Sequence, residues 1–243
     1  MQGVRLCRVN LPQTARQHKI RFMQLSTAEE NYLKAIYKIS EKKKDTVSSK
    51  EISKMVETSA ASVTDMLKRL AEKKLINYEK YRGVSLTDEG MDRATRLVRK
   101  HRLWEVFLVE RLHFGWEEVH EIAEQLEHIQ SEELVDRLEK HLDFPKFDPH
   151  GDPIPDKEGE IAVRPQVPLS ELNPHDVGII VGVNNTDTEF LLFLEDMGLV
   201  LGKQVNVLKK FDFDNTILVQ IKNGEKHTLS SKVAKNISIQ IKV

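Results

Sequence analysis

The chain has very little sulfur chemistry available to it. Only one of its 243 residues is a cysteine, Cys7, which excludes a disulfide framework and a zinc site built from thiolates. The sequence also lacks any run of about 18 apolar residues, the length that a membrane-spanning helix needs. Its first 22 residues contain no apolar core of a secretory signal. We therefore expect a cytoplasmic protein that does not interact with a membrane.

The chain also has almost no net charge, −1, although 31% of its residues are charged. The two signs are nevertheless unevenly distributed. Basic and acidic residues number 17 and 12 in residues 24–100, 6 and 17 in residues 101–160, and 9 and 9 in residues 161–243. The basic front predicts a polyanionic partner, and the acidic middle predicts a bound cation. An ordinary solvated acidic helix surface is the alternative for the middle.

Residues 1–23 carry five basic residues and no acidic ones. They show no clear amphipathic pattern, whereas a regular helical pattern begins directly after them. We predict that this segment is a disordered basic extension. A basic arm that touches DNA is the alternative.

Residues 24–95 have the pattern of a winged-helix domain. Ser26 starts a helix, and two shorter helices follow, joined by a turn at 57–59. Alternating residues at 76–78 and 84–86 then flank a basic turn, which predicts a hairpin, or wing. Two helices and a turn occur in many small domains, but the adjoining basic hairpin favours DNA binding.

The second short helix presents small and polar side chains at its front, which allow a close approach to base edges in a major groove. Basic residues follow at its end and on the wing, and these suit phosphates. Because long base-reading side chains are few, specificity should depend partly on DNA shape and water. The expected DNA-binding residues are Ser49, Ser59, Ala61, Ser62, Thr64, Asp65, Lys68, Arg69, Lys80 and Arg82.

The remaining chain predicts a helical domain and a small β-domain. Residues 96–143 form helices with large apolar faces, which two copies of the chain could bury by dimerising. Residues 144–163 hold four of the eight prolines and are predicted to be a linker. Residues 164–243 alternate in short strands with Gly and Asn-Gly turns, which indicates a small β-barrel.

Histidine and glutamate recur at helical spacing in the acidic middle, where five of the nine histidines lie between positions 101 and 141. The candidate metal ligands are His101, Glu105, His120, Glu124, Glu127 and His128. At about 100° per residue, the last four share one side of a helix, away from its apolar stripe. Imidazoles with carboxylates and no sulfur favour Mn²⁺ or Fe²⁺. The alternative is an acidic helix surface that holds no metal.

The order of these motifs resembles a known family. A winged helix, then RKHRLWE, VHEIAEQLEH and PHGDPIP, and then a small β-domain are similar to the DtxR/MntR family of metal-dependent transcriptional repressors, over residues 24–243. The resemblance implies a chain that is mainly α-helical with a small SH3-like (FeoA-like) β-barrel. It also implies a homodimer that binds metal between its DNA-binding and dimerisation domains and then grips a palindromic double-stranded operator.

Matched by position, the resemblance implies two metal sites. His101, Glu105 and His120 fall at the ancillary site, and Glu124, Glu127 and His128 at the primary site, to which Asn31 would add a side chain. This oxygen-rich set implies manganese first and iron second.

The chain departs from the family pattern in two places. Lys34 stands where the manganese type has a second acidic ligand, which puts a binuclear manganese geometry in doubt. The β-domain of the family can lend a Glu and a Gln to the ancillary site. This chain offers only Asn185 and Asp187 in the corresponding segment.

We therefore expect a metal-dependent DNA-binding repressor of metal-uptake genes that is not an enzyme. One alternative is a metal-independent winged-helix regulator that senses a small organic molecule. The other is a metal-dependent hydrolase, because His/Glu clusters also activate water.

Overall fold

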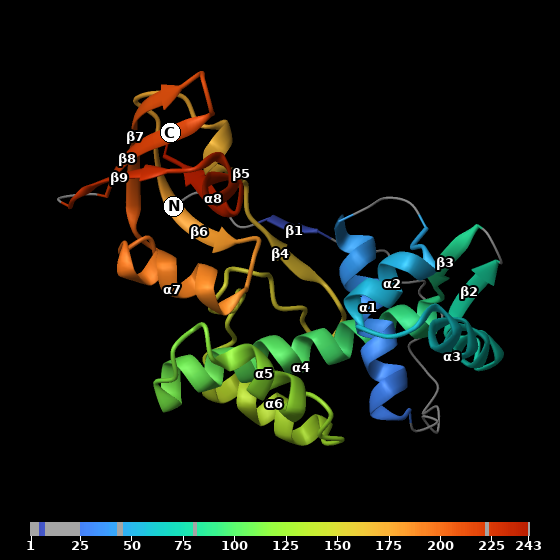
Figure 1. The fold of residues 1–243 in the computed structure, drawn as a ribbon. Helices are drawn as coiled ribbons and strands as arrows, with labels where there is room; N and C mark the ends of the chain where they lie inside the picture. Colours follow the sequence, from blue (N-terminus) through green and yellow to red (C-terminus); the bar gives the residue numbers. More distant parts are fainter. Residues whose placement is uncertain (1–4, 8–24, 43–45, 80–81, 222–223, 243) are drawn as a thin grey trace.

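The computed structural model describes residues 5–7, 25–42, 46–79, 82–221 and 224–242. Figure 1 shows an N-terminal lobe of helices and a hairpin, a second group of helices below a long central helix, and a β-domain above it. The helices and strands of the first lobe are α1 (Thr27–Lys42), α2 (Ser49–Met55), α3 (Ala60–Glu72), β2 (Ile76–Glu79) and β3 (Gly83–Leu86). No helix among the described residues is long and apolar enough to cross a membrane.

The first lobe is the predicted winged helix. Capping hydroxyls start its helices: the Ser48 side chain accepts from Glu51 N, and the Ser59 side chain accepts from Ser62 N. α3 buries Val63, Leu67 and Leu70 against α1 and the hairpin, which leaves its polar front toward solvent. The apolar spacing of the sequence therefore decides which side of α3 is free to meet DNA.

The central helix α4 (Asp88–Leu112) has 25 residues and starts at the Thr87 cap, directly after the wing. It ends where His113 adopts a left-handed backbone with φ 59°. The expected boundary between residues 24–95 and 96–143 therefore falls inside a continuous helix, which is shared by both domains. α5 (Val119–Leu126) and α6 (Glu132–His141) complete the second helical group.

The proline-rich segment 144–163 ends in a strand, β4 (Ile161–Val163), which pairs antiparallel with β1 (Arg5–Cys7). Three residues of the segment that we expected to be disordered are therefore in a strand. Residues 1–4 and 8–23 lie outside the described ranges, so their disorder stays a prediction.

The C-terminal domain is a six-stranded antiparallel sheet with the order β5-β10-β6-β7-β8-β9. Its elements are β5 (Val167–Pro168), a 3-10 turn (Leu169–Glu171), β6 (Val177–Val183), α7 (Thr188–Asp196), β7 (Gln204–Phe211), β8 (Thr216–Ile221), β9 (Lys226–Leu229), α8 (Ser231–Lys235) and β10 (Ile237–Ile241). Trp116, from the turn between α4 and α5, packs into this core. The β-domain therefore rests on the helical domain beside the candidate ligands.

An ion pair joins the end of α3 to the start of α1. Lys73 Nζ lies 2.6 Å from Glu29 Oε1, and Glu29 is only 3% exposed. Glu29 also accepts from Ser26 N at 2.9 Å, which caps α1. Lys73, whose place in the sequence suited a phosphate, thus ties the DNA-facing helix to α1.

We predict that Glu29→Gln destabilises the protein in a pH-dependent way. Burial opposes the charge of Glu29, but its bonds to Lys73 and Ser26 hold its pKa below the ordinary value. A depressed folded-state pKa gives stability that is present above the unfolded value of about 4.3 and is lost as pH falls through the folded value. We expect a loss of about 1–2 kcal/mol at pH 7 that shrinks toward pH 3.

Urea unfolding of both proteins between pH 3 and 7 measures this difference. Glu72→Gln, on the exposed end of α3, is the matched control and should change stability little. A pH-independent loss for Glu29→Gln would show that the carboxylate charge is not what stabilises the link.

Candidate metal centre and DNA interface

The candidate metal centre begins on α4. His101 and Glu105 are one helical turn apart and therefore share a face, and they are 3% and 2% exposed. Glu105 Oε1 lies 2.9 Å from His101 Nε2. Two polar side chains at this depth need partners, and the partners come from α5 and from the loop after α6.

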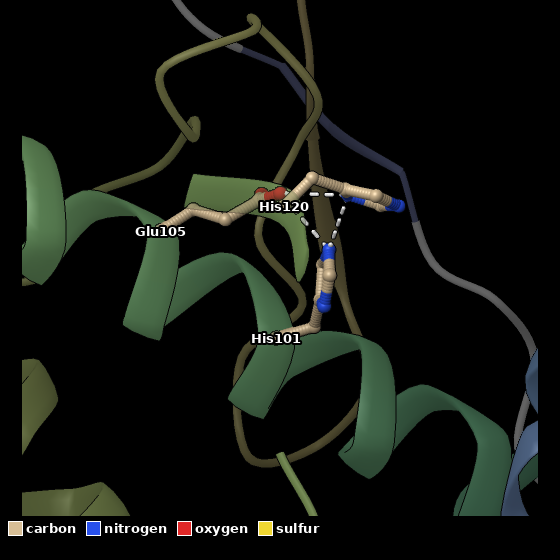
Figure 2. Close-up of side chains that lie close together, drawn as sticks. All are labelled: His101, Glu105 and His120. Atoms are coloured by element: carbon tan, nitrogen blue, oxygen red, sulfur yellow. Dashed lines mark hydrogen bonds and ion pairs between the residues drawn. The ribbon is translucent and has the colours of Figure 1, made fainter. Parts of the chain in front are cut away.

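His120, near the start of α5, completes a triangle (Figure 2). Its Nδ1 lies 3.1 Å from Glu105 Oε1 and 3.1 Å from His101 Nε2. A transition metal binds imidazole nitrogen and carboxylate oxygen at about 2.0–2.2 Å, so neighbouring ligand atoms are about 3 Å apart. The three donor atoms therefore have the spacing that one metal ion requires, as well as the chemistry.

Glu127 orients the first of these imidazoles. His101 Nδ1 donates to Glu127 Oε2 at 2.6 Å, so Nε2 is the nitrogen that faces Glu105 and His120. Glu127 is fully buried. Burial opposes its charge, yet the bond from His101 and the nearby Lys34 ammonium hold the pKa of Glu127 below its ordinary value. A carboxylate that fixes the tautomer of a ligand in this way is the usual outer partner of a metal-bound histidine.

A second group of ligand atoms meets the same carboxylate from the segment predicted to be a linker. Asp148, His150 and Glu105 form a second set that could hold a metal, and all three are buried. His150 Nε2 donates to Trp116 O at 2.8 Å, so Nδ1 faces Glu105 Oε1 at 3.8 Å. Our sequence analysis did not assign Asp148 or His150. The signal was the acid–histidine–acid pattern DPHGDP, part of which contributed to the family resemblance while its residues were placed in a linker and not among the ligands.

The charges of this second group depend on one another. Burial raises the pKa of Asp148 to about 7, helped by the negative charges of Glu105 and Asp152. Burial disfavours the charge of His150, but the Glu105 carboxylate 3.8 Å away raises its pKa to about 9. Glu105, although buried, keeps a pKa well below the ordinary value because His101, His120 and His150 surround it. Glu105 is therefore the anionic centre of both groups.

Arg102, the neighbour of His101 on α4, fixes the loop that carries Asp148 and His150. Its Nη1 donates to Pro153 O at 2.5 Å, and its other nitrogens lie 3.6 Å from Asp148 and 3.5 Å from Asp152. Arg102 is 4% exposed. α4 thus supplies two candidate ligands, His101 and Glu105, and also Arg102, which holds the loop with Asp148 and His150 in place. The geometry of the centre therefore depends on this one helix.

A cavity of about 300 Å³ lies beside these ligands. Its walls come from all three parts of the chain: Lys38 and Met55 from the DNA-binding lobe, His101 and His120 from the helical domain, and Thr186 from the β-domain. Asn185 and Asp187, the two residues offered by the β-domain, are engaged locally: Asn185 Oδ1 accepts from Asp187 N, and Asp187 caps α7.

The second predicted site is arranged differently from the expectation. α5 ends at Leu126, so Glu127 is the C-cap and His128 lies beyond the helix, although the sequence pattern places both on its face. Asn31 is exposed, and its neighbour Glu30 instead receives His128 Nδ1 at 2.5 Å. Asn31 was implied by the family resemblance alone, and no spacing in the sequence singles out either residue of α1. Glu30 is therefore a contact that the sequence analysis missed.

Lys34 lies where a metal of this second site would be expected. Its Nζ donates to Glu127 Oε2 at 2.6 Å and lies 3.5 Å from Glu124 Oε1 and 3.2 Å from His101 Nδ1. Glu124 also lies 3.6 Å from His120 Nε2. The candidate ligands of the two sites thus form one continuous cluster.

The predicted DNA-binding residues lie on an exposed face of the first lobe. Ser59, Ala61, Ser62, Asp65, Lys68 and Arg69 are exposed along α3, whereas Ser49 and Thr64 are half-buried. Lys68 lies 3.4 Å from Asp65, and Thr64 Oγ1 donates to Ala60 O. These side chains can rearrange toward a ligand at small cost because their partners are exposed and close in sequence.

The wing extends beyond α3 as the hairpin β2–β3, in which Ile76 pairs with Leu86. Arg82 is 82% exposed and lies 3.2 Å from Glu79, while Lys80 lies outside the described residues. Gly83 closes the turn with φ 106°, and a Cβ there would come within 2.8 Å of Thr46 Oγ1. Arg82 therefore lies directly before β3, where the backbone packs closely against Thr46.

Three family models match the chain in succession. They describe the N-terminal DNA-binding domain of iron dependent repressors over residues 24–84, the metal binding and dimerisation domain of iron dependent repressors over residues 87–156, and a FeoA domain over residues 167–241. The match covers each part of the fold described above. It agrees with the order of domains that the sequence predicted.

Relatives and solved structures agree with these models. The chain is 30% identical over 224 residues to the iron-dependent repressor IdeR of Mycobacterium leprae, covering 87% of this chain and 96% of that one. A manganese-dependent transcriptional repressor in complex with manganese has a TM-score of 0.80 at 34% identity, covering 88% of this chain and all of the other.

Another relative is much longer than the chain. The protein named "Probable metal transport system membrane protein" of Chlamydia trachomatis is 45% identical over 86 residues, and these are 35% of this chain and 19% of that protein. Over the full length of its fold, however, the chain follows the repressors. The chain belongs to the family of iron-dependent and manganese-dependent transcriptional repressors, with its DNA-binding, metal-binding and FeoA domains in that order.

Proposed function

We propose that this chain is a cytoplasmic repressor, without enzymatic activity, that binds operator DNA as a homodimer when a divalent metal is bound. The observation that carries the proposal is the convergence of His101, His120 and Glu105 within 3.1 Å, beside the DNA-binding lobe. The donor set of imidazole and carboxylate suits Mn²⁺ first and Fe²⁺ second. We expect it to control metal-uptake genes.

The residues that would hold the metal come from different elements. His101 and Glu105 lie on α4 and His120 on α5, with Asp148 and His150 facing the same carboxylate. A divalent cation there would supply the positive charge that this acidic cluster requires. Glu127 holds the tautomer of His101, and Arg102 holds the loop with Asp148. The chain thus holds the donors of the centre together through contacts of its own residues.

α1 connects this centre with DNA. Its residue Glu30 contacts His128, its residue Lys34 contacts Glu127, and its residue Glu29 pairs with Lys73 at the end of α3. Any change in the cluster that moves α1 relative to α4 also moves α3. In a dimer, this would change the spacing of the two recognition helices across a palindromic operator.

We predict that His120→Ala weakens Mn²⁺ binding at least tenfold, because it removes one of three converging donors. Isothermal titration of Mn²⁺ into the metal-free protein measures the effect. His113→Ala is the matched control, since His113 is exposed at the end of α4. Equal affinities for the two variants would contradict the assignment of His120.

Operator affinity should fall steeply with salt, by about 0.9 log unit per log unit of salt for each phosphate neutralised. We predict that Arg82→Ala weakens binding to all sequences similarly and lowers this slope by about 1. Fluorescence anisotropy at several salt concentrations measures both. Arg137→Ala, exposed on α6, should leave the slope unchanged. A flat salt dependence of the unmodified protein would refute the phosphate contacts.

Metal and operator should strengthen each other's binding by the same factor, about 5–150-fold, because coupling free energy is reciprocal. Anaerobic operator titrations with Mn²⁺ or Fe²⁺, each repeated with chelator, measure this factor and rank the metals. Chelator-independent binding would instead indicate a metal-independent regulator. Turnover of a phosphoester by the metal-loaded protein would indicate a hydrolase.

A further inference from the structure

Lys34 places a buried positive charge among candidate metal ligands of another domain. It lies on α1 and is 5% exposed, and its ammonium contacts Glu127 at 2.6 Å and lies 3.5 Å from Glu124. An ammonium is expensive to bury unless acceptors surround it. Here the acceptors are two carboxylates that the sequence pattern assigned to a metal.

One oxygen of Glu127, the one that faces Glu124, is fully engaged without a metal. Its Oε2 receives Lys34 Nζ and His101 Nδ1, both at 2.6 Å, and its Oε1 makes no hydrogen bond to any described residue. A metal ion bound by both Glu124 and Glu127 would need Glu127 Oε2, and this oxygen already accepts from Lys34 and from His101. Glu127 orients His101 and is neutralised by Lys34.

His128, the third predicted ligand of that site, is also engaged elsewhere. Its Nδ1 points at Glu30 of α1, and Gln130 donates to the other oxygen of Glu30 at 3.0 Å. Its Nε2 lies 3.8 Å from Glu127 Oε1. The two ends of the predicted site therefore connect separately to α1, through Lys34 and through Glu30.

We infer that Lys34 is a tethered cation that takes the place of a metal ion between Glu124 and Glu127, so that each protomer binds a single transition-metal ion, at His101, Glu105 and His120. This inference rests on the proposed function and adds its stoichiometry. The link from α1 to the helical domain at Lys34 is then permanent. Metal concentration acts only through the His101 cluster, and the metal response of one protomer has a single binding step.

The test is the number of Mn²⁺ ions bound per protomer, measured by equilibrium dialysis and elemental analysis of the full chain. We expect one ion for the unmodified protein and for Lys34→Arg, which keeps the charge. We expect two for Lys34→Met, which removes the charge at nearly constant length. Lys54→Met, exposed on α2 and away from the cluster, is the matched control and should bind one ion.

Combining variants locates each ion. His120→Ala should lose the single ion at micromolar free Mn²⁺, and Lys34→Met combined with His120→Ala should bind one ion at the opened second site. Lys34→Gln keeps a donor for Glu127 without the charge and serves the same purpose if Lys34→Met does not fold. It should also bind two ions.

Two ions per unmodified protomer would overturn the inference and leave the proposed function intact, and this measurement needs no variant to fold. One ion in both folded Lys34→Met and Lys34→Gln would overturn it as well. If no variant and no unmodified protein binds Mn²⁺, Fe²⁺ or Co²⁺, the proposed function fails together with the inference.

Discussion

The carboxylate of Glu105 is the interaction on which the rest of this molecule depends. It is 2% exposed, yet it faces imidazoles from α4, α5 and the loop after α6. A buried negative charge is stable only where positive charge or donors surround it. The helical domain and the loop at Asp148 must therefore close around this one group, and the Trp116 that follows α4 carries the β-domain to the same place.

The second constraint is that α1 joins the DNA-binding lobe to the candidate metal centre through ion pairs and hydrogen bonds. Glu30 and Lys34 lie about one turn apart on α1 and reach opposite ends of the same group of residues. Glu29 turns the other way, to Lys73. Neighbouring residues of α1 therefore contact the candidate metal centre on one side and the end of α3 on the other.

Much of the fold followed from the sequence because local patterns decide it. The caps at Ser48 and Ser59, the apolar spacing of α3 and the alternation around Gly83 predicted the winged helix correctly. Helical spacing singled out His101, Glu105 and His120 as candidates, and the family resemblance grouped them, as the structure does.

The rest depended on contacts that spacing does not encode. His150 and Asp148 reach Glu105 only because Arg102 folds a proline-rich loop back onto α4. The choice of Glu30 over Asn31 follows from the rotation of α1 about its axis, which its packing on α4 sets. That α5 stops at Leu126, so that Glu127 turns inward, follows from burial and not from the helical pattern.

The continuity of α4 has a mechanical consequence. Its 25 residues make a rod of about 37 Å, which starts at the wing and carries the ligands in its middle. A rod without a break has no hinge of its own, so the two lobes cannot swing apart at their boundary. A tilt of about 10° about Glu105, which lies about 25 Å from the start of α4, would instead carry that end about 4 Å sideways. Sub-ångström adjustments around Glu105 are thereby enlarged to the scale of the spacing between base pairs.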